Sequence, residues 1–248
     1  NMYDQAKTRA TVSVEDEDKA PCFSDAPMVR YYEAPLAAGR QKMDIKRAWE
    51  QRLNEVSAVF KTCPELSEGS ASFSFQILRT YFVNSEGSLV VQNRVATRVM
   101  LMASLKAADG MELPLNRDYF AYTPDDLPDN DRMIADARDM IKRLLALRDA
   151  PVADPYTGPA ILSGPASGVF FHEIFGHRLE GHRLKSGGQT FKKMVGEQVL
   201  PVEFQVYCAP LLKRYADTDL YGHYVYDDEG VKARRVDNVV NGVLKEFL

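Results

Sequence analysis

The stretch Gly168-Val-Phe-Phe-His-Glu-Ile-Phe-Gly-His-Arg-Leu-Glu-Gly-His182 contains three of the four histidines in the chain. His172, His177 and His182 recur at intervals of five residues, and Glu173 follows the first of them in an apolar frame. Neutral imidazole is a common zinc ligand, and a neighbouring carboxylate can move the proton of a zinc-activated water. The stretch therefore predicts the site of a zinc hydrolase.

The spacing of the histidines places a condition on the backbone. The motif is H-E-x-x-x-H, and five steps of a regular α-helix would leave the rings of His172 and His177 ~140° apart around the helix. Both rings can face one ion only if the helix contains a π-bulge, a kink or an end, which we expect near Gly176. The competing interpretation is a buried amphipathic helix that carries histidines at its ends.

A wider pattern identifies a family. The segment from Gly164 to His182 resembles the signature of the TldD/PmbA metallopeptidases, which are also called modulators of DNA gyrase, and the resemblance extends over roughly residues 158–248. It continues in four short stretches: Gly188-Gln-Thr-Phe191, Leu211-Leu-Lys-Arg-Tyr215, Tyr226-Asp-Asp-Glu-Gly230 and Asn241-Gly-Val-Leu-Lys-Glu-Phe-Leu248.

The resemblance implies a zinc-dependent peptidase that hydrolyses peptides or unfolded protein segments and binds one zinc ion. His172 and His177 match the two metal-binding histidines of the family, and Glu173 matches its catalytic carboxylate. Family members take a third ligand, a cysteine, from a C-terminal region that lies beyond Leu248. The resemblance also implies a homodimer or a heterodimer with a related metal-free subunit. The alternative is a non-catalytic assembly or regulatory subunit with the same fold.

Other residues near the motif have less defined roles. Glu180 is a candidate for orienting a ligand imidazole, and pairing with Arg178 or Arg183 is an equal alternative. His182 is a candidate ligand or an outer residue of the site. Two further residues lie outside the motif: Cys208 is a candidate soft ligand too close to the motif to match the family cysteine, and His223 is expected to be structural.

Composition excludes several classes of protein. The net charge is −4 and the basic residues are dispersed, which argues against a nucleic-acid surface. No apolar run approaches the ~20 residues that span a bilayer. Three widely separated cysteines argue against a disulfide framework and favour a reducing compartment, so we expect a cytoplasmic protein, although a removed leader is compatible with the sequence.

Periodicity predicts an α+β fold with an antiparallel sheet, packed helices, and a motif helix that leads into a β-rich domain. We expect an extended arm over 1–40 with a short strand at 28–32, an α+β domain over 41–150, and the motif helix with a truncated β-rich catalytic domain over 158–248. The helices are predicted at 44–61, with Asp44 as cap and Trp49 in the core, and at 131–148. The strands are predicted at 73–83, 89–105, 119–122, 160–162, 204–207, 221–226, 234–240 and 243–248.

The end of the predicted strand at Leu248 leaves its pairing edge open, which indicates that the chain is a central piece of a longer peptidase. The isolated chain of 248 residues is accordingly expected to be inactive, because the third metal ligand is missing.

Overall fold

The computed structural model describes residues 26–36, 41–185 and 191–248. These residues form two compact units. The sheet unit comprises Met28–Gly158 and Pro210–Ala233, and the histidine unit includes Pro159–Ala209 and Arg234–Leu248. The predicted division of the chain into domains at 149–159 stays a prediction, and the units follow the chain less simply, because Pro210–Ala233 clusters with the earlier residues.

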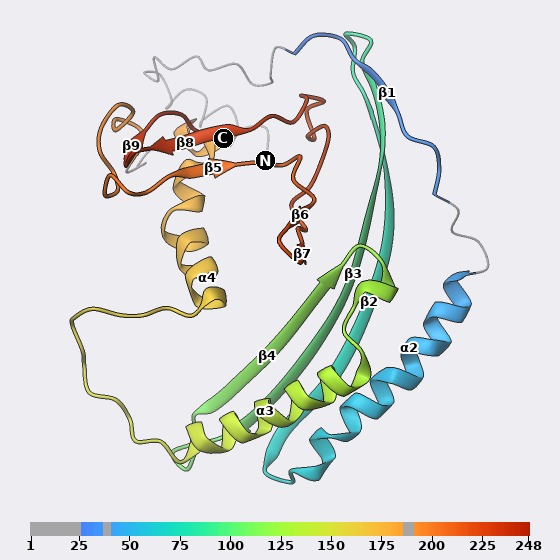
Figure 1. The fold of residues 1–248 in the computed structure, drawn as a ribbon, viewed down its shortest axis with the longest axis vertical. Coiled ribbons are helices and arrows are strands. Elements are labelled where there is room, and N and C mark those ends of the chain that lie inside the picture. Colours follow the sequence, from blue (N-terminus) through green and yellow to red (C-terminus); the bar gives the residue numbers. More distant parts are fainter. Residues whose placement is uncertain (1–25, 37–40, 186–190) are drawn as a thin grey trace, which may run out of the picture. The chain divides into compact units, whose positions relative to one another are not determined.

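The sheet unit is built on long antiparallel strands, as predicted (Figure 1). β2 (Leu66–Val83) pairs with β3 (Leu89–Lys106), which pairs with β4 (Glu112–Ala121). Tight turns join them, and Gly87 and Gly110 adopt positive φ angles of 90° and 89°, which glycine reaches without a steric penalty. The short strand predicted at 28–32 is β1 (Arg30–Tyr32), which runs parallel to β3.

Two helices cover one face of this sheet, α2 (Gln41–Ala58) and α3 (Asn130–Arg148). Their apolar positions pack on alternate residues of β3 and form the main core, in which Trp49 is buried and stacks on Phe73 at a centroid distance of 4.3 Å. The core residues of β3 and α3 are Val99, Leu101, Ala103, Leu105, Met133, Ala137, Met140 and Leu144.

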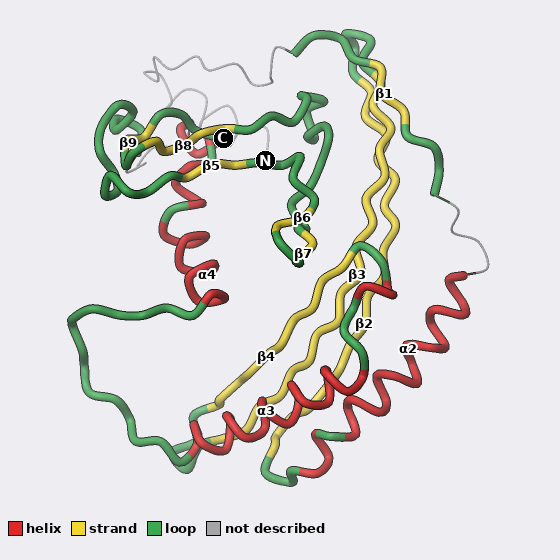
Figure 2. Tube along the Cα trace, viewed as in Figure 1, coloured by secondary structure: helices red, strands yellow, loops and turns green. Residues whose placement is uncertain are grey.

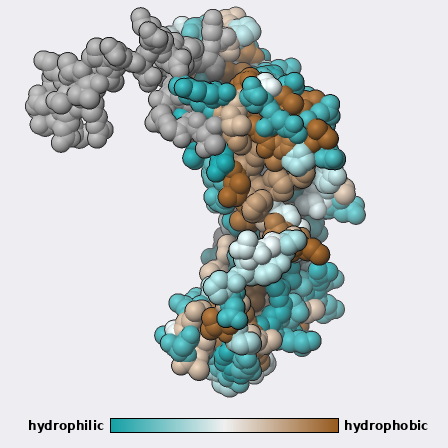
Figure 3. Space-filling model, turned by 90° about the vertical axis from the view of Figure 1, so that its left-hand side faces the viewer, coloured by the Kyte–Doolittle hydropathy of each residue, from teal (hydrophilic) through white to brown (hydrophobic). Residues whose placement is uncertain are grey.

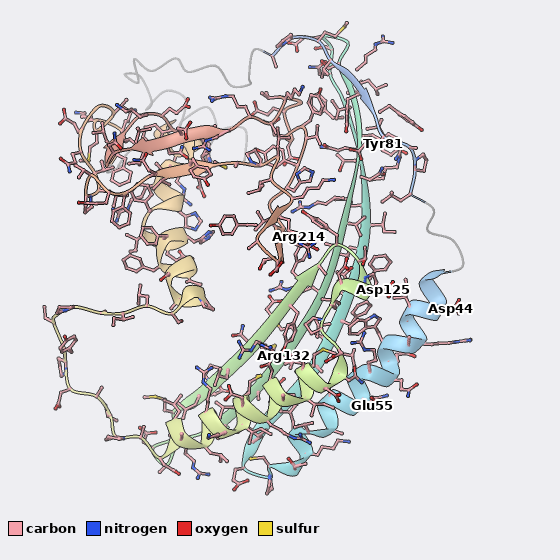
Figure 4. The ribbon with its side chains drawn as sticks, viewed as in Figure 1. Asp44, Glu55, Tyr81, Asp125, Arg132 and Arg214 are labelled. Atoms are coloured by element: carbon pink, nitrogen blue, oxygen red, sulfur yellow. The ribbon has the colours of Figure 1, made fainter. Side chains whose placement is uncertain are left out.

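The predicted cap of α2 is wrong. The helix already includes Gln41, so Asp44 lies in its first turn, where the helix dipole stabilises a negatively charged carboxylate (Figure 4). In α3 the cap is Asp129, whose carboxylate accepts a hydrogen bond of 2.8 Å from the backbone N–H of Arg132. Asp129 therefore acts locally, at the start of the helix.

The histidine unit contains α4 (Gly164–Ile174), two short 3₁₀ helices, η3 (Gly176–Leu179) and η4 (Gly181–Lys185), and a small sheet. Its strands are β5 (Val206–Cys208), β8 (Val236–Val240) and β9 (Val243–Leu244), in the order β5-β8-β9. A hairpin at Asn241-Gly242 joins β8 to β9, and both residues have positive φ, 50° and 76°. The unit closes on its own core of Phe175, Leu179, Phe191, Val239 and Leu244.

Three of the predicted strands are absent or end early in the structure, and the two predicted at 204–207 and 234–240 begin two residues later than expected. Residues 160–162 are loop, and the side chain of Ile161 is fully exposed, since the run between α3 and α4 has no strand to pair with (Figure 2). Residues 221–226 form turns and an isolated bridge, and the nearby pairing is instead between β6 (Arg214–Tyr215) and β7 (Thr218–Asp219). The last strand ends at Leu244, although Leu248 still makes backbone hydrogen bonds.

Candidate metal centre

The predicted break between His172 and His177 is confirmed. α4 ends at Ile174, Phe175 is its cap, and the chain continues as the 3₁₀ helix η3 from Gly176. The break begins one residue before Gly176 and uses no positive φ there, so it does not depend on the freedom of glycine. A change from α to 3₁₀ geometry alters the rotation per residue, which frees the two imidazoles from the ~140° separation of a regular helix.

Burial explains where the helix ends. Phe175 and Leu179, with 5% and 3% of their surfaces exposed, anchor the turn in the core of the histidine unit, and the Phe175 ring meets the Phe191 ring edge-on at 5.3 Å. The helix itself has no buried residue. Its large apolar side chains Val169, Phe170, Phe171 and Ile174 are exposed, and Figure 3, which views the side where α4 lies, shows apolar residues open at the surface. The competing prediction of a buried helix is therefore wrong.

The break brings the predicted ligands together. The rings of His172 and His177 lie 4.5 Å apart between centroids, at 69° to each other. The Glu173 carboxylate lies beside both, with oxygens 3.8 Å from His172 Nε2 and 3.7 Å from His177 Nε2. His172, Glu173 and His177 each offer a donor atom within 4.8 Å of the others, and within the described ranges they are the one group of three that could hold a metal ion.

Glu180 contacts the second of these histidines from the outer side. Its Oε1 lies 2.6 Å from His177 Nδ1, and its Oε2 accepts a hydrogen bond from Arg183 Nε. The hydrogen bond from His177, together with that from Arg183, lowers the pKa of the Glu180 carboxyl below its ordinary value. An ionised carboxylate only accepts hydrogen bonds, so Nδ1 is the donor in this contact, and Nε2 is the ring nitrogen that lies toward Glu173.

The sequence left two roles open for Glu180, orienting an imidazole or pairing with Arg178 or Arg183, and the structure brings both His177 and Arg183 to it. Arg178 instead lies with its guanidinium 5.7 Å from the centroid of the Phe191 ring. Sequence reasoning missed a further contact: the backbone of Leu248 donates to Leu179 O at 2.8 Å and accepts from Gly181 N at 3.1 Å. These two hydrogen bonds hold the main chain on both sides of Glu180. No local sequence pattern predicts a contact between this turn and Leu248, because the two segments are far apart in the sequence.

The remaining candidates lie outside the group. His182 is 77% exposed, and its Nε2 lies 3.7 Å from a Glu180 oxygen. Cys208 is half-buried, and burial raises the pKa of its thiol. His223 belongs to the sheet unit, where its Nδ1 lies 3.0 Å from Pro210 O and burial is the main cause that lowers its pKa.

The donors suit a divalent transition metal. Two imidazoles, one already oriented through its far nitrogen, and a carboxylate are the ligand types that zinc takes in hydrolytic sites. Zinc in catalytic sites commonly has three protein ligands. The group supplies these three donors only if Glu173 binds the ion itself.

Comparison with known proteins agrees with this arrangement. Residues 155–248 match the model of the PmbA/TldA metallopeptidase C-terminal domain. The chain is 28% identical over 185 residues to a metalloprotease of Methanocaldococcus jannaschii, covering 72% of this chain and 38% of that protein. It is 24% identical to a zinc metalloprotease TldD homolog of Saccharolobus solfataricus, covering 83% of this chain and 45% of that protein. The chain thus spans less than half the length of these relatives.

Solved structures show the same fold. A Thermotoga maritima protein described as a modulator of a DNA gyrase superimposes with a TM-score of 0.64 at 18% identity, over 98% of this chain and 53% of that chain. TldE from Thermococcus kodakarensis gives a TM-score of 0.54, also at 18% identity, over 99% of this chain and 53% of that one. None of the helices in the described residues combines the length and apolar character needed to cross a bilayer. The signature around His172, the domain model matched over residues 155–248 and the shared fold make this chain similar to the TldD/PmbA family of metallopeptidases.

Proposed function

We propose that the chain carries the metal centre of a zinc-dependent peptidase that hydrolyses peptides or unfolded protein segments. The observation that supports this most is the convergence of His172 and His177 at the end of α4, with ring centroids 4.5 Å apart and Glu173 beside both. A regular helix would separate these rings, so their approach depends on the break after Ile174. The names of the relatives, metalloprotease and zinc metalloprotease, support the same chemistry.

In this proposal His172 and His177 hold the ion, and Glu180 orients His177 from behind. Zinc, when bound, supplies a Lewis acid that polarises a peptide carbonyl and acidifies a water. Glu173 acts as the general base and acid: its carboxylate, 60% exposed and next to both imidazoles, accepts a proton and returns it to the leaving amine. His182 stays at the rim, where its exposed ring is placed to meet solvent or substrate.

The third ligand and the partner belong to the same proposal. The family cysteine would complete the coordination from sequence that this chain does not contain, and Glu173 then remains free for proton transfer. The shared fold with TldE supports a dimeric arrangement, either of two copies or with a related metal-free subunit. A cytoplasmic location remains part of the proposal.

The decisive experiment is Glu173→Gln in a version of the protein extended to the length of its relatives. We expect peptide hydrolysis to fall by at least about 100-fold, the contribution of a general base, with zinc content unchanged by mass spectrometry. Glu203→Gln, an exposed glutamate of the same unit, is the matched control and should leave both quantities unaltered.

Other results separate the alternatives. Loss of zinc together with activity in Glu173→Gln would make Glu173 a ligand rather than the base. Near wild-type hydrolysis would remove Glu173 from the mechanism. A wild-type protein that contains no zinc and cleaves no peptide would favour the non-catalytic subunit instead.

A further inference from the structure

We propose that Arg183 is a positioning residue, which, through its ion pair with Glu180, keeps His177 in the tautomer that leaves Nε2 open for the metal. This inference rests on the proposed function, since it assigns a role in preparing the same site. It concerns a side chain six residues after His177, the last residue of the H-E-x-x-x-H motif, and three residues after Glu180.

Nδ1 of His177 has two neighbours with opposite requirements for hydrogen bonding. Glu180 Oε1 lies 2.6 Å away and, as a carboxylate, can only accept a hydrogen bond. Arg183 Nη2 lies 3.3 Å away and can only donate one. A neutral imidazole nitrogen either carries a proton or accepts one, so only one of these contacts is a hydrogen bond at a time.

The two alternatives have opposite effects on metal binding. If Nδ1 donates to Glu180, the lone pair resides on Nε2, the nitrogen that faces Glu173. If Nδ1 accepts from Arg183, the proton moves to Nε2, and that nitrogen has no lone pair for an ion. The shorter distance assigns the first tautomer to the structure.

Arg183 stabilises the Nδ1–H tautomer of His177 through its ion pair with Glu180. The guanidinium Nε donates to Glu180 Oε2, so the carboxylate has one oxygen on Arg183 and the other on His177. That ion pair fixes the plane of the carboxylate, which aims Oε1 at Nδ1. The backbone bonds of Leu248 to Leu179 and Gly181 hold the main chain from which Glu180 projects.

Removing Glu180 should then do more than delete a hydrogen bond. His177 Nδ1 would lose its acceptor, and the Arg183 Nη2 donor, 3.3 Å away, would remain the neighbour of that nitrogen, which favours the tautomer that cannot bind the ion. The sign of the Arg183 contribution therefore depends on Glu180: Arg183 assists metal binding when Glu180 is present and opposes it when Glu180 is absent.

The test uses the full chain of 248 residues and two readouts. The first is the tautomer of His177 in the metal-free protein, read from long-range ¹H–¹⁵N correlations of the imidazole. The second is the dissociation constant for Zn²⁺ alone, from competition with a chromophoric chelator. The variants are Arg183→Gln, Arg183→Lys, Glu180→Ala and the double variant Glu180→Ala with Arg183→Gln. The matched control is Arg178→Gln, which removes the same charge from the same segment, where Arg178 faces Phe191.

The expected results differ for each variant. The wild type should show the Nδ1–H form. Glu180→Ala should shift His177 to the Nε2–H form and weaken zinc binding by about 10- to 100-fold, the usual effect of losing an outer-shell partner. Arg183→Gln should give a mixture and weaken binding by about 3- to 10-fold, less than that loss because it acts through Glu180. Arg183→Lys should recover most of the affinity, and the double variant should bind zinc more tightly than Glu180→Ala alone.

Several results would overturn the inference. These are an unchanged tautomer in Glu180→Ala, an Arg183→Gln variant indistinguishable from Arg178→Gln, or a loss from Arg183→Gln that is equal with and without Glu180. If Glu180→Ala fails to fold by circular dichroism, the Gln and Lys variants at Arg183 decide the matter by their tautomers. Absence of zinc from the protein extended to the length of its relatives would refute the proposed function, whereas the tautomer measured in the chain of 248 residues tests the role of Arg183 separately.

Discussion

Phe175→Ala offers a direct test of the idea that burial after the helix, rather than the helix itself, builds the metal centre. Phe175 is 5% exposed and packs edge-on against Phe191 in the small core of the histidine unit. Removing a buried phenylalanine side chain costs about 3–5 kcal/mol, because apolar contacts are lost and a cavity remains. Phe171, four residues earlier on α4 and 39% exposed, is the matched control, and its truncation should cost less than about 1 kcal/mol.

The assay must report on the histidine unit alone, because two units need not unfold together. Cys208 lies half-buried in that unit, so the rate of its labelling by a thiol reagent in increasing urea measures local unfolding. The background carries Cys22→Ala and Cys63→Ala, which leave Cys208 as the one thiol. Zinc affinity, measured in the absence of urea, should fall by about tenfold or more in Phe175→Ala, since the turn that carries His177 loses its support.

The reasoning would be refuted by equal effects at the two positions. If Phe175→Ala costs no more than Phe171→Ala, the turn after Ile174 is not held by this core. If stability falls as expected but zinc affinity is unchanged, the core supports the fold without setting the position of His177.

The remaining predictions follow from single contacts. Gly181→Ala would place a Cβ 2.3 Å from the main-chain oxygen of Leu248, so we expect a destabilisation of about 1–3 kcal/mol in urea and a shifted imidazole spectrum for His177. Asp136 is buried, and burial alone would raise the pKa of its carboxyl, but hydrogen bonds from Tyr119 and Arg132 lower it overall. Its contribution to stability is therefore present above the ordinary aspartate pKa of about 3.9 and is lost as the pH falls through the lower folded value. Asp136→Asn should flatten that loss in urea midpoints measured from pH 5 to pH 2, and an unchanged pH profile would contradict the assignment.

Much of the sheet unit could be predicted from the sequence because its signals are local. Three patterns each predict the conformation of their own segment. They are the spacing of apolar residues around Trp49 in α2, the alternation along β2 and β3, and the turn residues at 84–87. The pairing of β1 with β3 in parallel was not predictable, because it joins segments about 60 residues apart with no local pattern to mark the direction.

The histidine unit was predicted less well, for a related reason. Its strands are two to five residues long, too short for periodicity to show, and their existence depends on pairing across the unit. The group of His172, Glu173 and His177 remains a predicted site, although the predicted helix end that lets it assemble is present. That end was predictable because two histidines five residues apart cannot bind one ion from a regular helix. The expectation of a metal site therefore required a break in the helix.

The choice between Arg178 and Arg183 as the partner of Glu180 shows what the sequence lacked. On an α-helix Arg183, three residues after Glu180, and Arg178, two residues before it, would be distinguished by their faces, but the segment is not α-helical. Glu180 has extended backbone, with φ −68° and ψ 109°, and its carbonyl accepts the N–H of Arg183 at 3.1 Å, which opens the 3₁₀ turn η4. Side chains three residues apart eclipse in 3₁₀ geometry, so Arg183 comes to lie beside Glu180, whereas Arg178 belongs to the preceding turn and points to Phe191. The partner of the glutamate is thus decided by the same local geometry that ends α4, and that geometry depends on which side chains are buried.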